Sequence, residues 1–159
     1  WKEVYICRSK AELIEHYNES GLLTMILQEF IDFDHFVRCI CLGQEEILPI
    51  RYDPRARAYI VDDEYMGPKL RERVTKDCRT IVKALGYDMN SIEFAVKDGV
   101  PYAIDFMNPA PDFDINSLTP AYFQWVVSHM ADLAIALAND PRKQAEALGG
   151  AAMFKASRA

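Results

Sequence analysis

The chain has 159 residues, 50% hydrophobic and 26% charged, which predicts a globular domain with a substantial buried core. The net charge of −6 and the lack of a run of Lys and Arg argue against a general nucleic-acid or anionic-membrane surface. No apolar run approaches the roughly 20 residues that a membrane-spanning helix needs.

The first part of the chain predicts a strand, a helix and a second strand. Residues 3–7 have the composition of a strand, and residues 24–31 form a dense apolar run that also favours a strand. Between them, Ser9 is placed to cap a helix over residues 10–18, because its hydroxyl can accept a free backbone N–H.

The middle of the chain predicts an antiparallel meander followed by a helix. Two β-prone runs, 35–42 and 47–52, are separated by a short turn, and 58–61 adds an edge strand. Residues 68–85 have apolar side chains at intervals of three and four, with Pro at the first position and Gly just after the last.

The segment from Ile92 to Asp105 predicts a β-hairpin around the turn Asp98-Gly99, because Gly tolerates positive φ and Asp can bond its own backbone. Alternation places Glu93 and Asp105 together on one face, and this pairing requires an odd number of residues in the hairpin loop. The opposite face is expected to be apolar and to consist of Ile92, Phe94, Val96, Tyr102, Ile104 and Phe106.

The end of the chain predicts two helices. The first covers residues 120–137, with its apolar side facing the core through Tyr122, Val126, Val127, Met130, Leu133 and Leu137. A second helix is expected from Asp140-Pro141 to Leu148, and the small-residue tail 149–159 is expected to fray.

The four cysteines have no metal-type spacing, so we expect free, mostly buried thiols and a cytoplasmic location. The hairpin offers a different metal chemistry. Two carboxylates and the amide of Asn108 make an all-oxygen anionic site that suits Mg²⁺ carrying phosphates. The alternative is an ordinary edge hairpin with an acidic outer face, and spacing alone favours it, although Ala95 and Ala103 leave room for a ligand.

The string IEFAVKDGVPYAIDFMNPAPD resembles the metal-binding end of the ATP-grasp superfamily of carboxylate–amine ligases. The resemblance implies that Glu93, Asp105 and Asn108 hold Mg²⁺. The family often has Asp where this chain has Glu93 and Glu where it has Asp105. The exchange keeps the charge and changes the reach of each side chain.

A second string, MILQEFIDFDHFVRC, resembles the adenine-binding hinge of the same superfamily. The resemblance implies that Glu29, Phe30 and Ile31 line the adenine pocket, with Asp34 as the candidate for the ribose hydroxyls. The usual carboxylate of the family falls at Phe36 in this chain. The alternative is that all of these are strand-end residues beside a hydrophobic core.

Arg38 and Arg51 each interrupt an otherwise apolar or neutral strand. Guanidinium groups bind phosphate and carboxylate in a bidentate manner and stay charged, so two of them on neighbouring strands could form a phosphate cradle. Members of the superfamily often have Arg at these two places. The alternative is an ion pair with a nearby carboxylate such as Asp53.

These features together predict an α+β fold, with an antiparallel β-sheet packed against helices. The resemblance implies the C-terminal lobe of an ATP-grasp domain over 32–148, a remnant of the preceding lobe and hinge strand over 1–31, and a flexible tail over 149–159. No Gly-rich phosphate loop is present and the chain opens on Trp1, so we expect a piece of a longer protein.

The implied activity of that parent protein is an ATP-dependent carboxylate–amine (or thiol) ligase that works through an acyl-phosphate. Its cofactors would be ATP and Mg²⁺, and its partners small-molecule carboxylates and amines together with the missing N-terminal part of the same protein. The isolated piece is expected to be inactive. A kinase-like enzyme of the same superfamily and a non-catalytic α+β interaction module are the alternatives.

Overall fold

The chain divides between Asp32 and Phe33 into two units, and each is described by itself. The structure is a computed structural model that describes residues 4–56, 58–62 and 64–141.

The first unit contains one helix, α1 (Lys10–Glu19). The helix begins where predicted, and the Ser9 hydroxyl accepts the backbone N–H of Glu12 at 3.2 Å. The predicted strands at 3–7 and 24–31 are wrong, because residues 4–7 and 24–31 form no strand. Isolated strand pairs are at best marginally stable, and many apolar side chains of this unit are exposed, namely Ile6, Leu22, Leu23, Ile26, Leu27 and Phe30.

The second unit is built on a five-stranded antiparallel sheet with the order β3-β2-β1-β4-β5. The strands agree with the predicted meander and hairpin, and their bounds are β1 (His35–Leu42), β2 (Glu46–Asp53), β3 (Ala58–Ile60), β4 (Met89–Lys97) and β5 (Val100–Asp105). With its helices, the sheet confirms the predicted α+β class.

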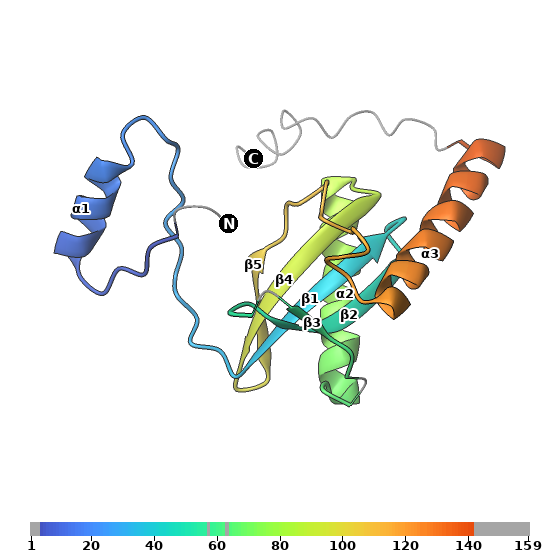
Figure 1. Cartoon of the computed structure of the whole chain (residues 1–159), viewed down its shortest axis with the longest axis horizontal. Helices are drawn as coiled ribbons and strands as arrows, with labels where there is room; N and C mark the ends of the chain where they lie inside the picture. The colour runs from blue at the N-terminus through green and yellow to red at the C-terminus, as the bar shows by residue number, and fades with distance from the viewer. Residues whose placement is uncertain (1–3, 57, 63, 142–159) are drawn as a thin grey trace, which may run out of the picture. The chain divides into compact units, whose positions relative to one another are not determined.

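Two helices flank this sheet, α2 (Pro68–Leu85) and α3 (Pro120–Asn139). Gly86 ends α2 in the left-handed region at φ 71°, a conformation that glycine adopts without steric cost. In Figure 1 the two helices lie against opposite sides of the sheet. We call the side covered by α2 the back face and the side covered by α3 the front face.

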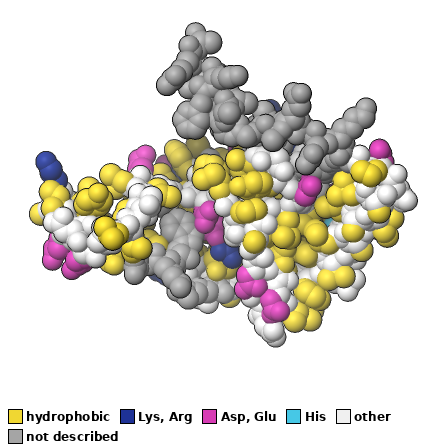
Figure 2. All heavy atoms as spheres, turned by 90° about the horizontal axis from the view of Figure 1, so that it is seen from above, with side chains coloured by type: hydrophobic (Ala, Val, Ile, Leu, Met, Phe, Trp, Pro, Cys, Tyr) yellow, Lys and Arg dark blue, Asp and Glu magenta, His cyan; other side chains and the backbone are white. Residues whose placement is uncertain are grey.

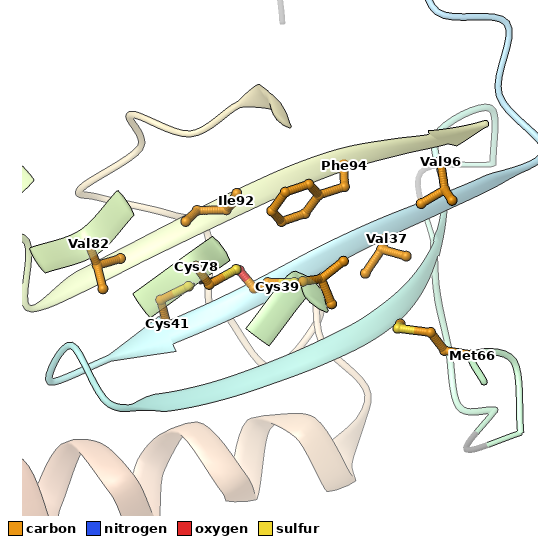
Figure 3. Close-up of a cluster of buried hydrophobic side chains, with 10 residues drawn as sticks. Val37, Cys39, Cys41, Met66, Cys78, Val82, Ile92, Phe94 and Val96 are labelled. Carbon is orange, nitrogen blue, oxygen red and sulfur yellow. Dashed lines mark hydrogen bonds between the residues drawn. The ribbon is translucent and has the colours of Figure 1, made fainter. Parts of the chain in front are cut away.

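The back face is apolar and closed (Figure 3). Odd-numbered residues of β1 point to it and pack with α2 and β4, forming a cluster of Val37, Cys39, Cys41, Met66, Val74, Cys78, Val82, Ile92, Phe94 and Val96. All four cysteines are free, as expected, and three of them are buried. Burial raises the pKa of the Cys39 thiol, so these thiols remain protonated members of the core.

The front face is only partly covered by α3. Its core comprises Ile40, Leu42, Ile50, Leu118 and Val126. The expectation that Val127 also faces inward is wrong, because its side chain is 44% exposed. Adjacent residues of a helix point about 100° apart, so the helix can bury Val126 or Val127 against one sheet but not both equally.

The helix predicted from Asp140-Pro141 to Leu148 and the tail 149–159 lie almost wholly outside the described residues. Within the part of the chain that is described, none of the helices combines the length and the apolar character needed to cross a membrane.

Candidate functional site

A polar patch on the front face extends across the sheet from β3 to β5. We define it as Arg38 of β1, Glu93 of β4, Asp105 of β5 and the rings of Tyr52 and Tyr59. Strand register brings these residues together, since Arg38 faces Glu93 and Glu93 faces Asp105 across neighbouring strands. Figure 2 shows acidic side chains at several separate places among hydrophobic ones. Within the patch, strand register pairs the two carboxylates of Glu93 and Asp105.

Arg38 is held from three sides. One guanidinium nitrogen, Nη2, donates to Oε1 of Glu93, and the other, Nη1, donates to the Tyr59 hydroxyl at 3.0 Å. The guanidinium carbon lies 3.9 Å from the centre of the Tyr52 ring, which is cation–π geometry. The remaining nitrogen, Nε, is buried and has no hydrogen-bond partner among the described residues.

The charges of the patch perturb one another. Burial lowers the pKa of Arg38, but the hydrogen bond to Tyr59 and the charge of Glu93 outweigh it and raise that pKa further above neutrality. Burial raises the pKa of Glu93, and Arg38 opposes this only in part. Arg38 is therefore a fixed cation, while Glu93 is a carboxylate whose ionisation the site disfavours.

Glu93 and Asp105 face each other as predicted, but the strand geometry that pairs them differs from the predicted one. The loop has two residues, Asp98 and Gly99, at φ 51° and 76°, and Lys97 pairs with Val100. An even loop alone would offset the carboxylates by one residue. A register shift next to Glu93 corrects the offset, so the prediction of an odd loop is wrong and a β-bulge takes its place.

The same register shift changes the apolar face of the hairpin. Phe94 pairs with Ala103, and Ala95 pairs with Tyr102. Ala103 therefore packs on the back core, and the expectation that Tyr102 lies on that face is wrong, as its side chain is 43% exposed. The bulge adds one residue to β5, and every side chain between it and the turn moves to the opposite face.

Asn108 lies close to the patch along β4. Its carbonyl accepts the backbone N–H of Ser91 at 3.3 Å, and Ser91 is the next front-face position after Glu93. Its own backbone N–H donates to the side chain of Asn90 at 3.0 Å. Sequence reasoning missed Asn90, although a signal was present, because it is a polar residue at the start of an apolar strand.

Arg51 lies away from the patch. It pairs with Val37 of β1, a back-face residue, whereas Arg38 pairs with Ile50 on the front face. The predicted cradle of two arginines is wrong, since residues one apart in register point to opposite sides of a sheet. Arg51 forms an ion pair at 2.9 Å, and its partner is Asp62 instead of the suggested Asp53.

The predicted nucleotide contacts fall in both units. Glu29, Phe30 and Ile31 belong to the first unit, where they lie in an extended segment outside any strand. Asp34 belongs to the second unit, and its carboxylate accepts the backbone N–H of Asp98 at 2.8 Å. In this arrangement Asp34 stabilises the β4–β5 turn.

The donor set fits a hard divalent cation in kind. Glu93 and Asp105 offer paired carboxylates, and Asn108 adds an amide oxygen on the adjoining segment, which is the oxygen chemistry that Mg²⁺ selects. Among the described residues no group of three His, Cys, Asp or Glu side chains is arranged to hold a metal. Two carboxylates with one amide also suit Mg²⁺ that keeps bound water and shares phosphate oxygens.

Solved structures that share this fold include two of D-alanine–D-alanine ligase from Bacillus anthracis. The one complexed with ATP aligns with a TM-score of 0.65 and 23% identity over 80% of this chain and 45% of that chain. The other aligns with a TM-score of 0.61 and 23% identity over 85% of this chain and 48% of that chain. No family profile and no curated protein sequence matches the chain. The ATP-grasp resemblance is thus confirmed for the fold, and the chain spans less than half the length of these ligases.

Proposed function

We propose that this chain supplies the C-terminal half of the nucleotide clamp in an ATP-dependent carboxylate–amine (or thiol) ligase. The observation that carries the proposal is the pairing of Glu93 and Asp105 beside Arg38 on the front face. Two anions and a fixed cation at one point form a site for a metal-bound polyphosphate. The ligase fold of the two aligned structures supports this choice.

In the proposed site, Glu93, Asp105 and Asn108 hold Mg²⁺, and Arg38 contacts the phosphates. When bound, Mg²⁺ would offset the negative charge of the phosphates and orient them. Arg38 contributes a positive charge that persists at neutral pH, since its pKa is raised and the guanidinium keeps its proton. Glu29, Phe30 and Ile31 are proposed for adenine and Asp34 for the ribose, whereas Arg51 is left out because it lies on the back face.

The proposed reaction takes place in two steps and needs no protein nucleophile. An oxygen of a substrate carboxylate attacks the γ-phosphorus of ATP, and the bond to the β,γ-bridging oxygen breaks, which leaves ADP and an acyl-phosphate. The nitrogen of an amine then attacks the acyl carbon, phosphate leaves, and the amine loses a proton. Arg38 would stabilise the charge on the phosphoryl oxygens.

Arg38 and Glu93 neutralise each other in this structure, and this has a consequence for binding. A cation that takes Glu93 frees the guanidinium of Arg38 for an anion, and an anion that takes Arg38 frees the Glu93 carboxylate for a cation. Metal and nucleotide should therefore each raise the affinity of the other.

Paramagnetic Mn²⁺ is a suitable probe for the site, because it broadens amide signals near it even when binding is weak. We expect Mn²⁺ with a non-hydrolysable ATP analogue to broaden the amides of Glu93, Asp105 and Asn108 in the NMR spectrum. Asp105→Asn should abolish this broadening. Asp114→Asn, a matched change in a neighbouring loop, should leave it unchanged, and broadening that follows Asp114 instead would refute the site.

A test of the chemistry needs a protein that contains both halves of the clamp, since the isolated chain is expected to turn over little ATP. With a carboxylate labelled by heavy oxygen, a ligase transfers one label to inorganic phosphate when an amine is present. A kinase-like enzyme instead leaves a phosphorylated product and releases no phosphate. ATP turnover without either outcome would refute acyl-phosphate chemistry.

The ion pair of Arg38 and Glu93 also favours a second candidate, a non-catalytic α+β interaction module. A buried carboxylate that is satisfied by its own arginine needs no metal for stability. The module predicts that Mn²⁺ leaves the amides of the patch unbroadened, with or without the nucleotide analogue. The two candidates are thus separated by the same NMR measurement.

A further inference from the structure

The most deeply buried polar side chain of β4 is Asn90, near the start of the strand, with 0% exposure. It pairs with Cys41, a back-face residue of β1. Its Nδ2 donates to the carbonyl of Phe106 at 2.9 Å, and its Oδ1 accepts the backbone N–H of Asn108 at 3.0 Å. The orientation of this amide is fixed, because the N–H of Asn108 must meet an acceptor and the carbonyl of Phe106 must meet a donor. One side chain therefore satisfies two backbone groups on the segment that leaves β5.

These two hydrogen bonds take the place of regular backbone pairing between β4 and the segment that follows β5. β5 ends at Asp105, so regular pairing with β4 stops there. Beyond it, the backbone of residues 106–108 bonds to the Asn90 side chain and to the N–H of Ser91. The chain therefore continues alongside β4 as far as residue 108. Asn108 stays next to Ser91, which lies on the same face of β4 as Glu93.

Hydrophobic packing does not explain the position of this segment. Phe106 is 37% exposed and Met107 is 60% exposed, so neither side chain anchors the backbone in the core. The side chain of Asn90 contributes two of the hydrogen bonds that hold the segment, and both are partly buried, which strengthens them relative to hydrogen bonds in water.

Among common side chains, few could do the same. Aspartate would offer only acceptors and would repel the Phe106 carbonyl, leucine offers neither group, and glutamine is one methylene longer. Removing the amide would leave two backbone groups without partners.

We infer that Asn90 is a positioning residue for the metal site: it fixes the backbone of residues 106–108 so that Asn108 can join Glu93 and Asp105 as a ligand. The inference rests on the proposed function, in which Asn108 is a ligand of Mg²⁺. Residues that orient metal ligands from behind affect metal affinity almost as strongly as the ligands themselves.

The test is a double-mutant cycle between Asn90 and Asn108, read out as the affinity for Mn²⁺ with the non-hydrolysable ATP analogue. Asn90→Ala should weaken Mn²⁺ binding about ten-fold, as expected for a residue that orients a ligand. In the Asn108→Ala background, the same change should have no further effect on affinity. An equal loss in both backgrounds would overturn the inference.

Two further variants keep the test decisive. Val74→Ala removes volume from the back core and should lower stability while leaving Mn²⁺ affinity unchanged. If Asn90→Ala fails to fold, Asn90→Asp keeps the side-chain volume and the acceptor for the N–H of Asn108, but it loses the donor to the carbonyl of Phe106. It should therefore weaken Mn²⁺ binding by a smaller factor, and unchanged affinity in Asn90→Asp would refute the role of Asn90.

The outcomes also separate this inference from the proposed function. Weaker Mn²⁺ binding in Glu93→Gln, Asp105→Asn and Asn108→Ala, but not in the Asn90 variants, would refute only the positioning role. Binding that survives in all of those variants would refute the metal site itself, and the role of Asn90 with it.

Discussion

The two faces of the sheet are made by the same strands and differ in what they accomplish. On the back face, β1 presents Val37, Cys39 and Cys41, and α2 covers them completely. On the front face, the same strand presents Arg38 between Phe36 and Ile40, and α3 covers only the part around Ile40. Successive side chains of a strand point to opposite faces of the sheet. One strand therefore contributes both to a core that stabilises the unit and to a patch that carries charge.

The largest effect should come from the closed face. Phe94→Ala removes a ring that is 1% exposed and leaves a cavity, which should lower the free energy of unfolding by about 3–5 kcal/mol. Urea unfolding measures this loss. Phe106→Ala truncates a partly exposed ring and is the control, so it should lower the free energy of unfolding far less. Similar losses of stability in both variants would contradict the contrast between the faces.

A smaller loss should come from breaking the ion pair of the patch. Arg38→Met leaves the carboxylate of Glu93 buried without its cation and should cost about 2 kcal/mol, less than a fully buried pair because Arg38 stays partly exposed. The double variant Arg38→Met/Glu93→Gln should recover part of this loss in urea unfolding. A double variant less stable than Arg38→Met would show that Glu93 is held by other contacts.

The pH dependence of stability should distinguish Glu93 from an exposed carboxylate. Because burial raises the pKa of Glu93 in the folded chain, its contribution is present below its unfolded pKa and is lost as pH rises through its folded pKa. The stability of the native chain relative to Glu93→Gln should therefore fall as pH rises above about 4, near the unperturbed pKa of glutamate.

Asp112 provides the opposite sign in the same experiment. The hydroxyl of Ser117 donates to its carboxylate and lowers the pKa of Asp112, so its contribution is present above its unfolded pKa and is lost as pH falls. The stability of the native chain relative to Asp112→Asn should rise with pH. If both differences had the same sign, Arg38 would outweigh burial at Glu93.

The smallest effect should come from the second arginine. Arg51 and Asp62 form an ion pair whose side chains are 42% and 31% exposed, and exposed pairs contribute little. Arg51→Met should change the free energy of unfolding by less than about 1 kcal/mol and should leave Mn²⁺ binding unaltered. A loss comparable to that of Arg38→Met would remove the distinction between the two positions.

Much of the second unit could be predicted from local signals. The Pro and Gly that bound α2, the β-prone run of β1 and the Asp-Gly turn are short-range features. The structure places most elements within one or two residues of their predicted bounds, although β4 begins at Met89, three residues before the predicted start of the hairpin. Predictions that depended on distant partners were less successful. The apolar run 24–31 has every property of a strand, yet it forms none, because a strand also needs a neighbour with which to share hydrogen bonds.

The sequence by itself determined the meander, the hairpin, the helix ends and the presence of two carboxylates close to one turn. Tertiary structure decided which charges meet. Only the sheet register pairs Arg38 with Glu93 and sends Arg51 to the other face, and only the bulge brings Asp105 opposite Glu93. Local periodicity fixes the order of side chains along one strand, whereas the alignment between strands depends on hydrogen bonds and packing among residues far apart in the chain.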